Sequence, residues 1–143
     1  MRAEISWDGQ VRFCATTESG HTMVLDGAPD AGGENAGMRP MEAVLVGMGA
    51  CSAFDVVTIL TKGRTGLVQC EVVLDAERAE SIPKVSTRVH MHYRVRGAAL
   101  TREKVHRAVE LSATKYCSAT RMVEKTANVS FDFEIVSAID SGA

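Results

Sequence analysis

The chain has 143 residues, enough for one domain with a core of its own or for one subunit of a tightly interlocked oligomer. Hydrophobic residues make up 45% and charged residues 24%, which is ordinary for a globular protein. A formal net charge of -2 without a basic cluster gives little electrostatic support for nucleic-acid binding, because phosphate neutralisation needs grouped Lys and Arg side chains.

The N-terminal residues predict a group of short strands. Apolar and polar residues alternate in segments 3–7 and 11–15, and the Asp-Gly pair between them is a turn signal, so the two segments predict a hairpin. Residues 21–25 predict a third strand. The small, polar and Gly-rich segment 28–38 predicts a loop.

Residues 41–62 are almost continuously apolar and predict a long helix. Pro40 suits the first turn, Glu42 and Lys62 complement the helix dipole, and Gly63 is placed to end the helix. A helix that is apolar on nearly all faces must be buried on nearly all faces. In a chain this small, such burial requires a sheet wrapped around the helix or a second subunit.

The remaining residues predict two strands, two helices and a final strand. Segments 66–79 and 84–95 are expected to form an antiparallel pair, because only a short loop separates them. The later elements are an amphipathic helix at 102–116 capped by Thr101, a short helix at 118–126 and an alternating strand at 128–136. We therefore expect an α+β fold in a single domain spanning residues 1–143.

No segment of the sequence predicts a membrane protein. The first residues lack the apolar core of a signal peptide, and the charge-free run from Ala43 to Phe54 is shorter than a bilayer span. We therefore expect a soluble cytoplasmic protein without a membrane partner.

Four cysteines stand at positions 14, 51, 70 and 117. They form no CxxC pair, and no histidine lies at a metal-ligand spacing from them, which argues against a structural zinc site. A reducing compartment also argues against a disulfide framework. Cys14 and Cys70, in or at the start of predicted strands, are best interpreted as packing residues.

Cys51 and Cys117 are the candidate reactive thiols. Cys51 lies within the long apolar helix, where a cysteine is often only a small buried hydrophobe. Cys117 lies at a predicted helix break, where a pocket or solvent is more often within reach. Taken alone, these positions leave both a packing role and a reactive role open.

The segments around both cysteines resemble the OsmC/Ohr family, which comprises osmotically induced protein C and the organic hydroperoxide resistance proteins. Pro40-Met-Glu42, Val44-Leu45 and Gly49-Ala-Cys51-Ser-Ala-Phe-Asp55 are similar to the family's central helix. Lys115-Tyr-Cys117-Ser matches a second cysteine after an amphipathic helix. The similarity covers essentially the whole chain and looks most like an uncharacterised OsmC-like branch.

This resemblance implies an OsmC-like fold, in which antiparallel sheets wrap around a long buried central helix within an intertwined homodimer. It also implies that Cys51 attacks an organic hydroperoxide and becomes a sulfenic acid, with which Cys117 condenses to a disulfide. An external dithiol then resets the pair. No metal and no organic cofactor are implied.

The resemblance further implies that an Arg and a Glu of the neighbouring subunit organise the thiolate. Glu42 is the candidate glutamate, although it stands one place later than in the Ohr branch, and Ser118 replaces the usual proline after the second cysteine. No Arg matches by motif, so Arg12 and Arg39 are candidates by location only. Arg39 lies roughly 18 Å before Cys51 along an ideal helix and could reach the thiol only from a partner subunit.

Three histidines are secondary candidates. His21 is interpreted as a locally hydrogen-bonded turn or strand residue, with a role beside the thiol as the alternative. His90 and His92 share one strand face, where a solvent-facing pair is favoured over a metal pair.

Two functions remain open at this level. The first is a thiol peroxidase that reduces organic hydroperoxides through peroxidatic Cys51 and resolving Cys117. The alternative is an OsmC-fold protein without efficient peroxidase activity that senses oxidants or binds a small apolar ligand.

Overall fold

The computed structural model describes residues 1–137. The chain divides into two compact units, Met1–Val46 and Gly47–Ala143, and each is described by itself. The predicted domain end at residue 143 lies outside the described residues.

The first unit is built on a small antiparallel sheet in the order β1-β2-β3. Its strands are β1 (Ala3–Trp7), β2 (Phe13–Thr17) and β3 (Thr22–Leu25). The predicted strands are all present, although β2 begins two residues later than its apolar alternation suggests. All five residues of β1 are exposed, so this sheet buries little within its own unit.

Asp26 organises the loop that follows β3. Its buried carboxylate accepts hydrogen bonds from the backbone N–H groups of Gly27 (2.8 Å), Glu34 (3.1 Å) and Ala36 (3.0 Å). These bonds, the one from Ala36 foremost, lower the pKa of Asp26 below its ordinary value. One carboxylate thus ties together a segment that otherwise contains only a short 3₁₀ turn, Pro29–Ala31.

The predicted long helix is α1, Pro40–Lys62, with the predicted bounds. Its buried residues are Met48, Gly49, Ser52, Val56 and Leu60, which form one stripe. Phe54, by contrast, is 72% exposed, and Val44, Val46 and Val57 are exposed as well. Within one chain, therefore, the helix is covered along one face, whereas its composition predicts burial on nearly all faces.

The second unit contains a sheet in the order β4-β5-β6, formed by β4 (Leu67–Arg78), β5 (Ser86–Gly97) and β6 (Asn128–Ile135). The β4 and β5 strands pair antiparallel, as predicted. The β6 strand pairs with β5 in parallel, so this sheet is mixed rather than wholly antiparallel. A parallel partner needs a crossover, and the helices between β5 and β6 supply it.

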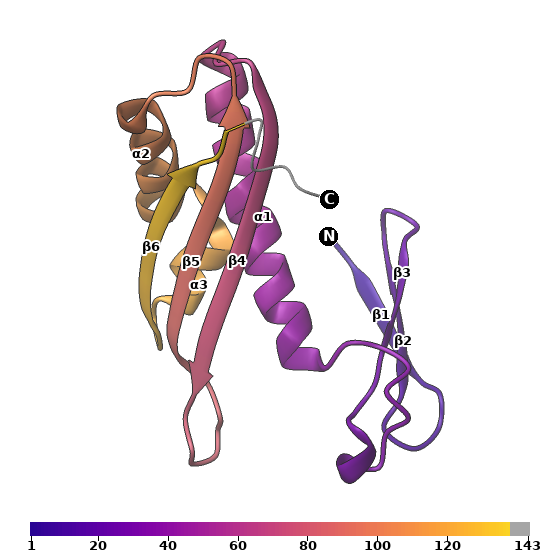
Figure 1. Cartoon of the computed structure of the whole chain (residues 1–143). Coiled ribbons are helices and arrows are strands. Elements are labelled where there is room, and N and C mark those ends of the chain that lie inside the picture. The colour runs from indigo at the N-terminus through magenta and orange to yellow at the C-terminus, as the bar shows by residue number, and fades with distance from the viewer. Residues whose placement is uncertain (138–143) are drawn as a thin grey trace. The chain divides into compact units, whose positions relative to one another are not determined.

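Helices cover one face of this sheet (Figure 1). The crossover contains α2 (Arg102–Leu111), a π-helical turn (Ser112–Tyr116) and α3 (Ser118–Val123). As predicted, Thr101 caps α2 and accepts a hydrogen bond from the N–H of Lys104 at 3.2 Å. Alternate residues of β5 are fully buried against the helices: Val89, Met91, Tyr93 and Val95.

The buried stripe of α1 packs on the sheet of the second unit. A Cβ at Gly49 would lie 2.7 Å from Leu74 Cδ1 in β4, so the helix approaches the strand more closely than a larger residue allows. The core is completed from α2 by Val105, Ala108 and Val109.

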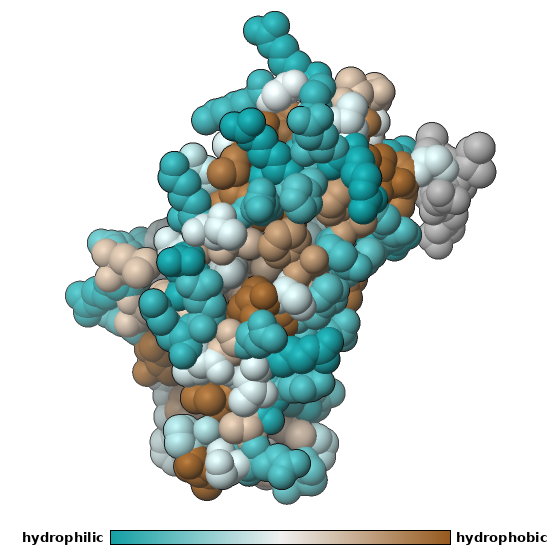
Figure 2. Space-filling view, turned by 90° about the vertical axis from the view of Figure 1, so that its left-hand side faces the viewer, coloured by the Kyte–Doolittle hydropathy of each residue, from teal (hydrophilic) through white to brown (hydrophobic). Residues whose placement is uncertain are grey.

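By length and composition, α1 is the one helix among residues 1–137 that could cross a membrane. The core helix of a soluble protein passes the same test, so this property carries little weight. On the face drawn in Figure 2, hydrophobic residues are scattered among hydrophilic ones.

Candidate functional site

The structure brings the two candidate thiols together in the second unit. Cys51 is half-buried on α1, and Cys117 is fully buried where the π-helical turn meets α3. Burial is the main cause that raises the pKa of the Cys117 thiol, and a side-chain hydrogen bond with Cys51 and the charge of Cys51 raise it further. Both cysteines are free thiols.

Thr120 supplies two hydrogen bonds to the Cys117 sulfur. Its hydroxyl donates at 3.1 Å and its backbone N–H at 3.4 Å. Both bonds lower the pKa of Cys117 and so oppose the larger effect of burial. The Cys117 thiol itself donates to the backbone carbonyl of Met48 at 3.9 Å, one turn before Cys51 on α1.

A buried polar network lies beside the thiols. The hydroxyl of Ser52, the residue after Cys51, hydrogen-bonds to the hydroxyl of Tyr93 on β5 and to the hydroxyl of Ser112 at 2.9 Å. Ser112 also approaches the backbone carbonyl of Ser52 (3.2 Å) and Oδ2 of Asp55 (3.0 Å). Ser52, Tyr93 and Ser112 are fully buried, so these groups satisfy one another without access to solvent.

Tyr93 remains a protonated hydroxyl in this setting. Burial is the first cause that raises the pKa of Tyr93 to about 12, partly opposed by the hydrogen bond with Ser52. The charges of Cys117, Cys70 and Asp55 raise it further. The phenol is therefore a hydrogen-bonding group near the thiols rather than a base at neutral pH.

Ser112 links the segments that carry the two thiols. Its side chain binds the turn of α1 that follows Cys51, and its backbone carbonyl accepts a hydrogen bond from the N–H of Cys117 at 2.9 Å. That last bond closes the π-helical turn, a feature that often marks functional sites. The network therefore helps to fix the position of Cys117 relative to α1.

Glu42 and the candidate arginines lie in the first unit, where each has local partners. The Glu42 carboxylate accepts a hydrogen bond from the backbone N–H of Arg39 at 2.9 Å and so caps α1. The Arg39 guanidinium donates to the Gly37 carbonyl at 3.2 Å and also to Asn35. Arg12 forms ion pairs with two carboxylates, those of Asp8 (3.1 Å) and Glu34 (3.3 Å).

The other two cysteines are half-buried in strands β2 and β4. Burial raises the pKa of the Cys70 thiol, which keeps it protonated and supports the predicted packing role. His21 shares a hydrogen bond with the Ser19 hydroxyl at 3.1 Å, the local arrangement that its turn position predicts.

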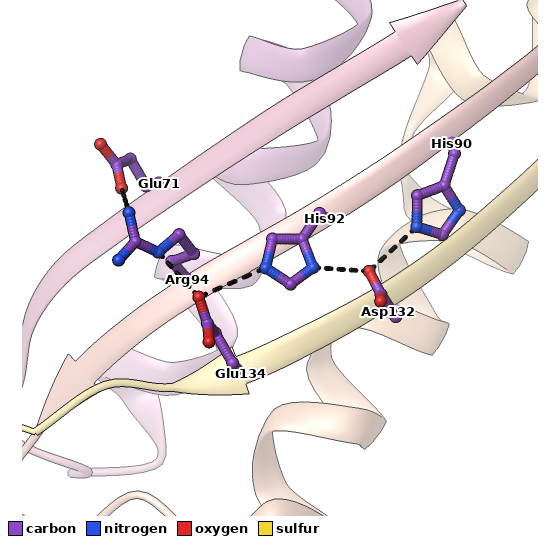
Figure 3. A network of polar contacts seen from close by, with 6 residues as sticks. All are labelled: Glu71, His90, His92, Arg94, Asp132 and Glu134. Carbon is purple, nitrogen blue, oxygen red and sulfur yellow. Dashed lines mark hydrogen bonds and ion pairs between the residues drawn. The ribbon is translucent and has the colours of Figure 1, made fainter.

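The two strand histidines belong to a charged row on the outer face of the second sheet (Figure 3). His90 Nε2 (3.0 Å) and His92 Nδ1 (2.7 Å) contact the same oxygen of Asp132 on β6. Glu134 pairs with Arg94 at 2.8 Å, and Arg94 reaches Glu71 on β4 at 3.3 Å. Among residues 1–137, no group of three His, Cys, Asp or Glu side chains has the geometry to hold a metal ion.

A hollow of about 380 Å³ lies next to the thiol-bearing segments. It is bordered by α1 beyond Cys51 and by Tyr116, the residue before Cys117. Its lining residues are Phe54, Asp55, Thr58, Ile59, Lys62 and Tyr116. The walls are mainly apolar, with one carboxylate and one ammonium group, and the volume suits a small organic molecule.

Sequence reasoning names Cys51 and Cys117 as candidates but does not find the polar groups around them. Ser52 and Asp55 carry a signal, because two polar residues interrupt an otherwise apolar helix at positions that follow Cys51. Tyr93 and Ser112 carry none, because their roles depend on how β5 and the crossover fold against α1.

Comparison with known proteins places the chain in a family. The profile described as "OsmC-like protein" matches residues 32–132. Protein YhfA of Escherichia coli (strain K12) is 44% identical over 141 residues, which cover 96% of this chain and 100% of YhfA. The chain belongs to the OsmC family.

Several solved structures share its fold. A hypothetical protein from Aquifex aeolicus VF5 is 28% identical, with a TM-score of 0.79 and coverage of 95% of this chain and 97% of that one. An organic hydroperoxide resistance protein OsmC from Legionella pneumophila has a TM-score of 0.71 over 93% and 95% of the two chains. That protein is only 15% identical, so it supports the fold alone.

These findings confirm the predicted family and the α+β, OsmC-like fold class.

Proposed function

We propose that this protein is a thiol peroxidase that reduces organic hydroperoxides, with Cys51 as the peroxidatic and Cys117 as the resolving cysteine. The observation that carries the proposal is that Cys117, on the crossover, packs against the turn of α1 that carries Cys51, where its thiol donates to the Met48 carbonyl at 3.9 Å. A packing role alone does not require two free cysteines to meet beside a buried polar network.

The reaction begins when the Cys51 thiolate attacks the terminal oxygen of the hydroperoxide. The O–O bond breaks, the alkoxide takes a proton and leaves as an alcohol, and Cys51 becomes a sulfenic acid. Cys117 then condenses with it to a disulfide and releases water. An external dithiol reduces the disulfide by exchange and restores both thiols, so no metal or organic cofactor takes part.

The hollow next to the segments that carry the thiols suits the organic part of such a substrate. Phe54, Ile59 and Tyr116 give it apolar walls, and Asp55 connects it to the Ser112 network. An alkyl or aryl hydroperoxide would place its apolar body there, whereas hydrogen peroxide has no group to bury. We therefore expect a preference for organic over inorganic peroxide.

We propose that the active form is a cytoplasmic homodimer in which each chain forms one OsmC-like domain over residues 1–143. The support is the uncovered apolar surface of α1 and of the first unit, which includes Trp7 at 70% exposure. In such a dimer, Glu42 of a second copy would assist Cys51. Sedimentation at increasing concentration tests the dimer, and a monomer at every concentration would refute it.

The decisive experiment is consumption of cumene hydroperoxide with dihydrolipoamide as reductant. The wild-type protein should turn over, Cys51→Ser should lose nearly all activity, and Cys14→Ser is the matched control that should retain it. Equal rates for wild type and Cys51→Ser would eliminate the peroxidase proposal.

A second candidate function is oxidant sensing or binding of a small apolar ligand, with little turnover. The observation that favours it is the local engagement of Glu42, Arg39 and Arg12, each of which already has partners in its own unit. Stoichiometric oxidation of Cys51 without turnover in the same assay would support this alternative.

A further inference from the structure

Thr120 occupies a position that the thiol chemistry above leaves unexplained. It is 1% exposed, and its hydroxyl and backbone N–H both point at the Cys117 sulfur, at 3.1 and 3.4 Å. A threonine with an ordinary structural role in a helix bonds its hydroxyl to a backbone carbonyl, as Thr114 does to Glu110 at 2.7 Å.

The surroundings of Cys117 distinguish its two protonation states. As a thiol, it can donate its proton to the Met48 carbonyl at 3.9 Å. As a thiolate, it loses that donation but still accepts both bonds from Thr120, and hydrogen bonds to a charged acceptor are the stronger kind. Thr120 therefore favours the anion at a site where burial disfavours it.

We propose that Thr120 is a positioning residue that presents the Cys117 sulfur, as a thiolate, to the oxidised sulfur of Cys51. This inference rests on the proposed peroxidase function and assigns a residue to its second step. The Cys117 thiolate attacks the sulfur of the Cys51 sulfenic acid, and an S–S bond forms as the S–O bond breaks. The departing hydroxide takes up a proton and leaves as water.

The need for such a residue follows from competition at Cys51. The sulfenic acid is either captured by Cys117 or attacked by a second peroxide, which gives a sulfinic acid. Thiolates rather than thiols are nucleophilic. A fully buried Cys117 without hydrogen-bond donors beside its sulfur would therefore form the disulfide with Cys51 slowly. The hydroxyl of Thr120 should thus determine how much peroxide the protein tolerates.

The test uses proteins that carry Cys14→Ser and Cys70→Ser, so that only the two relevant thiols remain. Disulfide closure is driven by diamide at concentrations where the rate no longer rises, so that the intramolecular step limits. Samples are acid-quenched, unfolded, alkylated and weighed by mass spectrometry across a pH series. Thr120→Val removes the hydroxyl and keeps the N–H, Thr120→Ser keeps both donors, and Thr114→Val is the matched control.

Thr120→Val should close roughly tenfold more slowly at neutral pH, and the midpoint of its pH profile should move up by about one unit. Thr120→Ser and Thr114→Val should behave like the parent protein. With excess cumene hydroperoxide, Thr120→Val should also accumulate more sulfinic acid at Cys51. An unchanged rate and pH midpoint in Thr120→Val would overturn the inference, as would a Thr120→Ser protein that is equally slow.

If circular dichroism shows that Thr120→Val does not fold, Thr120→Ala is compared with Thr120→Ser instead, with the same expected difference in closure rate and pH midpoint. The two proposals remain separable. A parent protein that consumes no hydroperoxide but shows the Thr120 effect with diamide would refute the peroxidase and support the positioning role. Hydroperoxide consumption by the parent protein, with rates of consumption and of diamide-driven closure that Thr120→Val leaves unchanged, would support the peroxidase and refute the positioning role.

Discussion

The two units of the chain reach their structures by different means. In the second unit, β5 buries alternate residues from Val89 to Val95 completely and the helices α2 and α3 cover one face of the sheet, so an apolar core holds the elements. In the first unit, β1 is exposed along its whole length. There, backbone pairing and the three hydrogen bonds to Asp26 provide the order that a core provides elsewhere.

This difference suggests that the second unit carries the proposed thiol chemistry, whereas the first unit serves the proposed dimer. The thiols and their polar network lie in the unit with its own core, which can hold buried hydroxyl groups at fixed distances. The first unit instead presents apolar side chains, including Ile5, Trp7 and Val24, to the outside. A surface of this kind is suited to contact with another copy of the chain, as in the proposed dimer.

Truncation of a core residue in each unit should give the largest contrast. Leu60→Ala in the second unit, where the side chain is 2% exposed, should lower the free energy of unfolding by about 2–5 kcal/mol because it leaves a cavity. Val24→Ala in the first unit, where the side chain is 42% exposed, should cost less than about 1 kcal/mol. Urea denaturation measures both.

Similar losses in the two variants would break the distinction between the units. A loss for Val24→Ala that grows with protein concentration would instead show that a second copy covers this side chain, and would strengthen the dimer proposal.

The polar network should give the next largest effect. Ser112→Ala leaves Ser52 and Asp55 without their shared partner, and such a loss typically costs about 1–3 kcal/mol when the groups are buried. It should also slow disulfide closure, because Ser112 connects the segment of Cys117 to α1. Ser118→Ala, an exposed serine next to Cys117, is the control and should change neither quantity. Equal effects of the two substitutions would argue against a special role for the network.

Much of this architecture follows from local patterns in the sequence. The bounds of α1 agree with prediction because Pro40 and Gly63 are local signals that act regardless of the rest of the fold. The Thr101 cap agrees for the same reason. The parallel β5–β6 pairing could not be predicted, because it depends on where the crossover returns the chain.

The candidate site divides in the same way. Cys51 and Cys117 were identified because a motif accompanies them, whereas Thr120 and Tyr93 become significant only through contacts made in the folded chain. The exposed face of α1 shows the limit of hydrophobicity as a guide. Composition shows that this face should be covered, but it does not show by what.

The outer face of the second sheet should give the smallest effect, and the size of this effect depends on pH. Hydrogen bonding to Asp132 is the first cause that raises the pKa of His92 above its ordinary 6.5, so the contribution of His92 to stability is complete below that pH and is lost as the pH rises through the raised value. Hydrogen bonding to His92 lowers the pKa of Asp132 below 3.8 and that of Glu134 below 4.5. The contribution of these carboxylates is present above their ordinary values and is lost as the pH falls through the lowered ones.

The charged row on the outer face of the second sheet should therefore stabilise the protein most between about pH 4.5 and 6.5. The difference in unfolding free energy between wild type and His92→Gln should be largest in that window and should shrink toward pH 8. A flat difference for His92→Gln across the pH range would mean that the row in Figure 3 is a solvated surface without a share in holding β6 to β5.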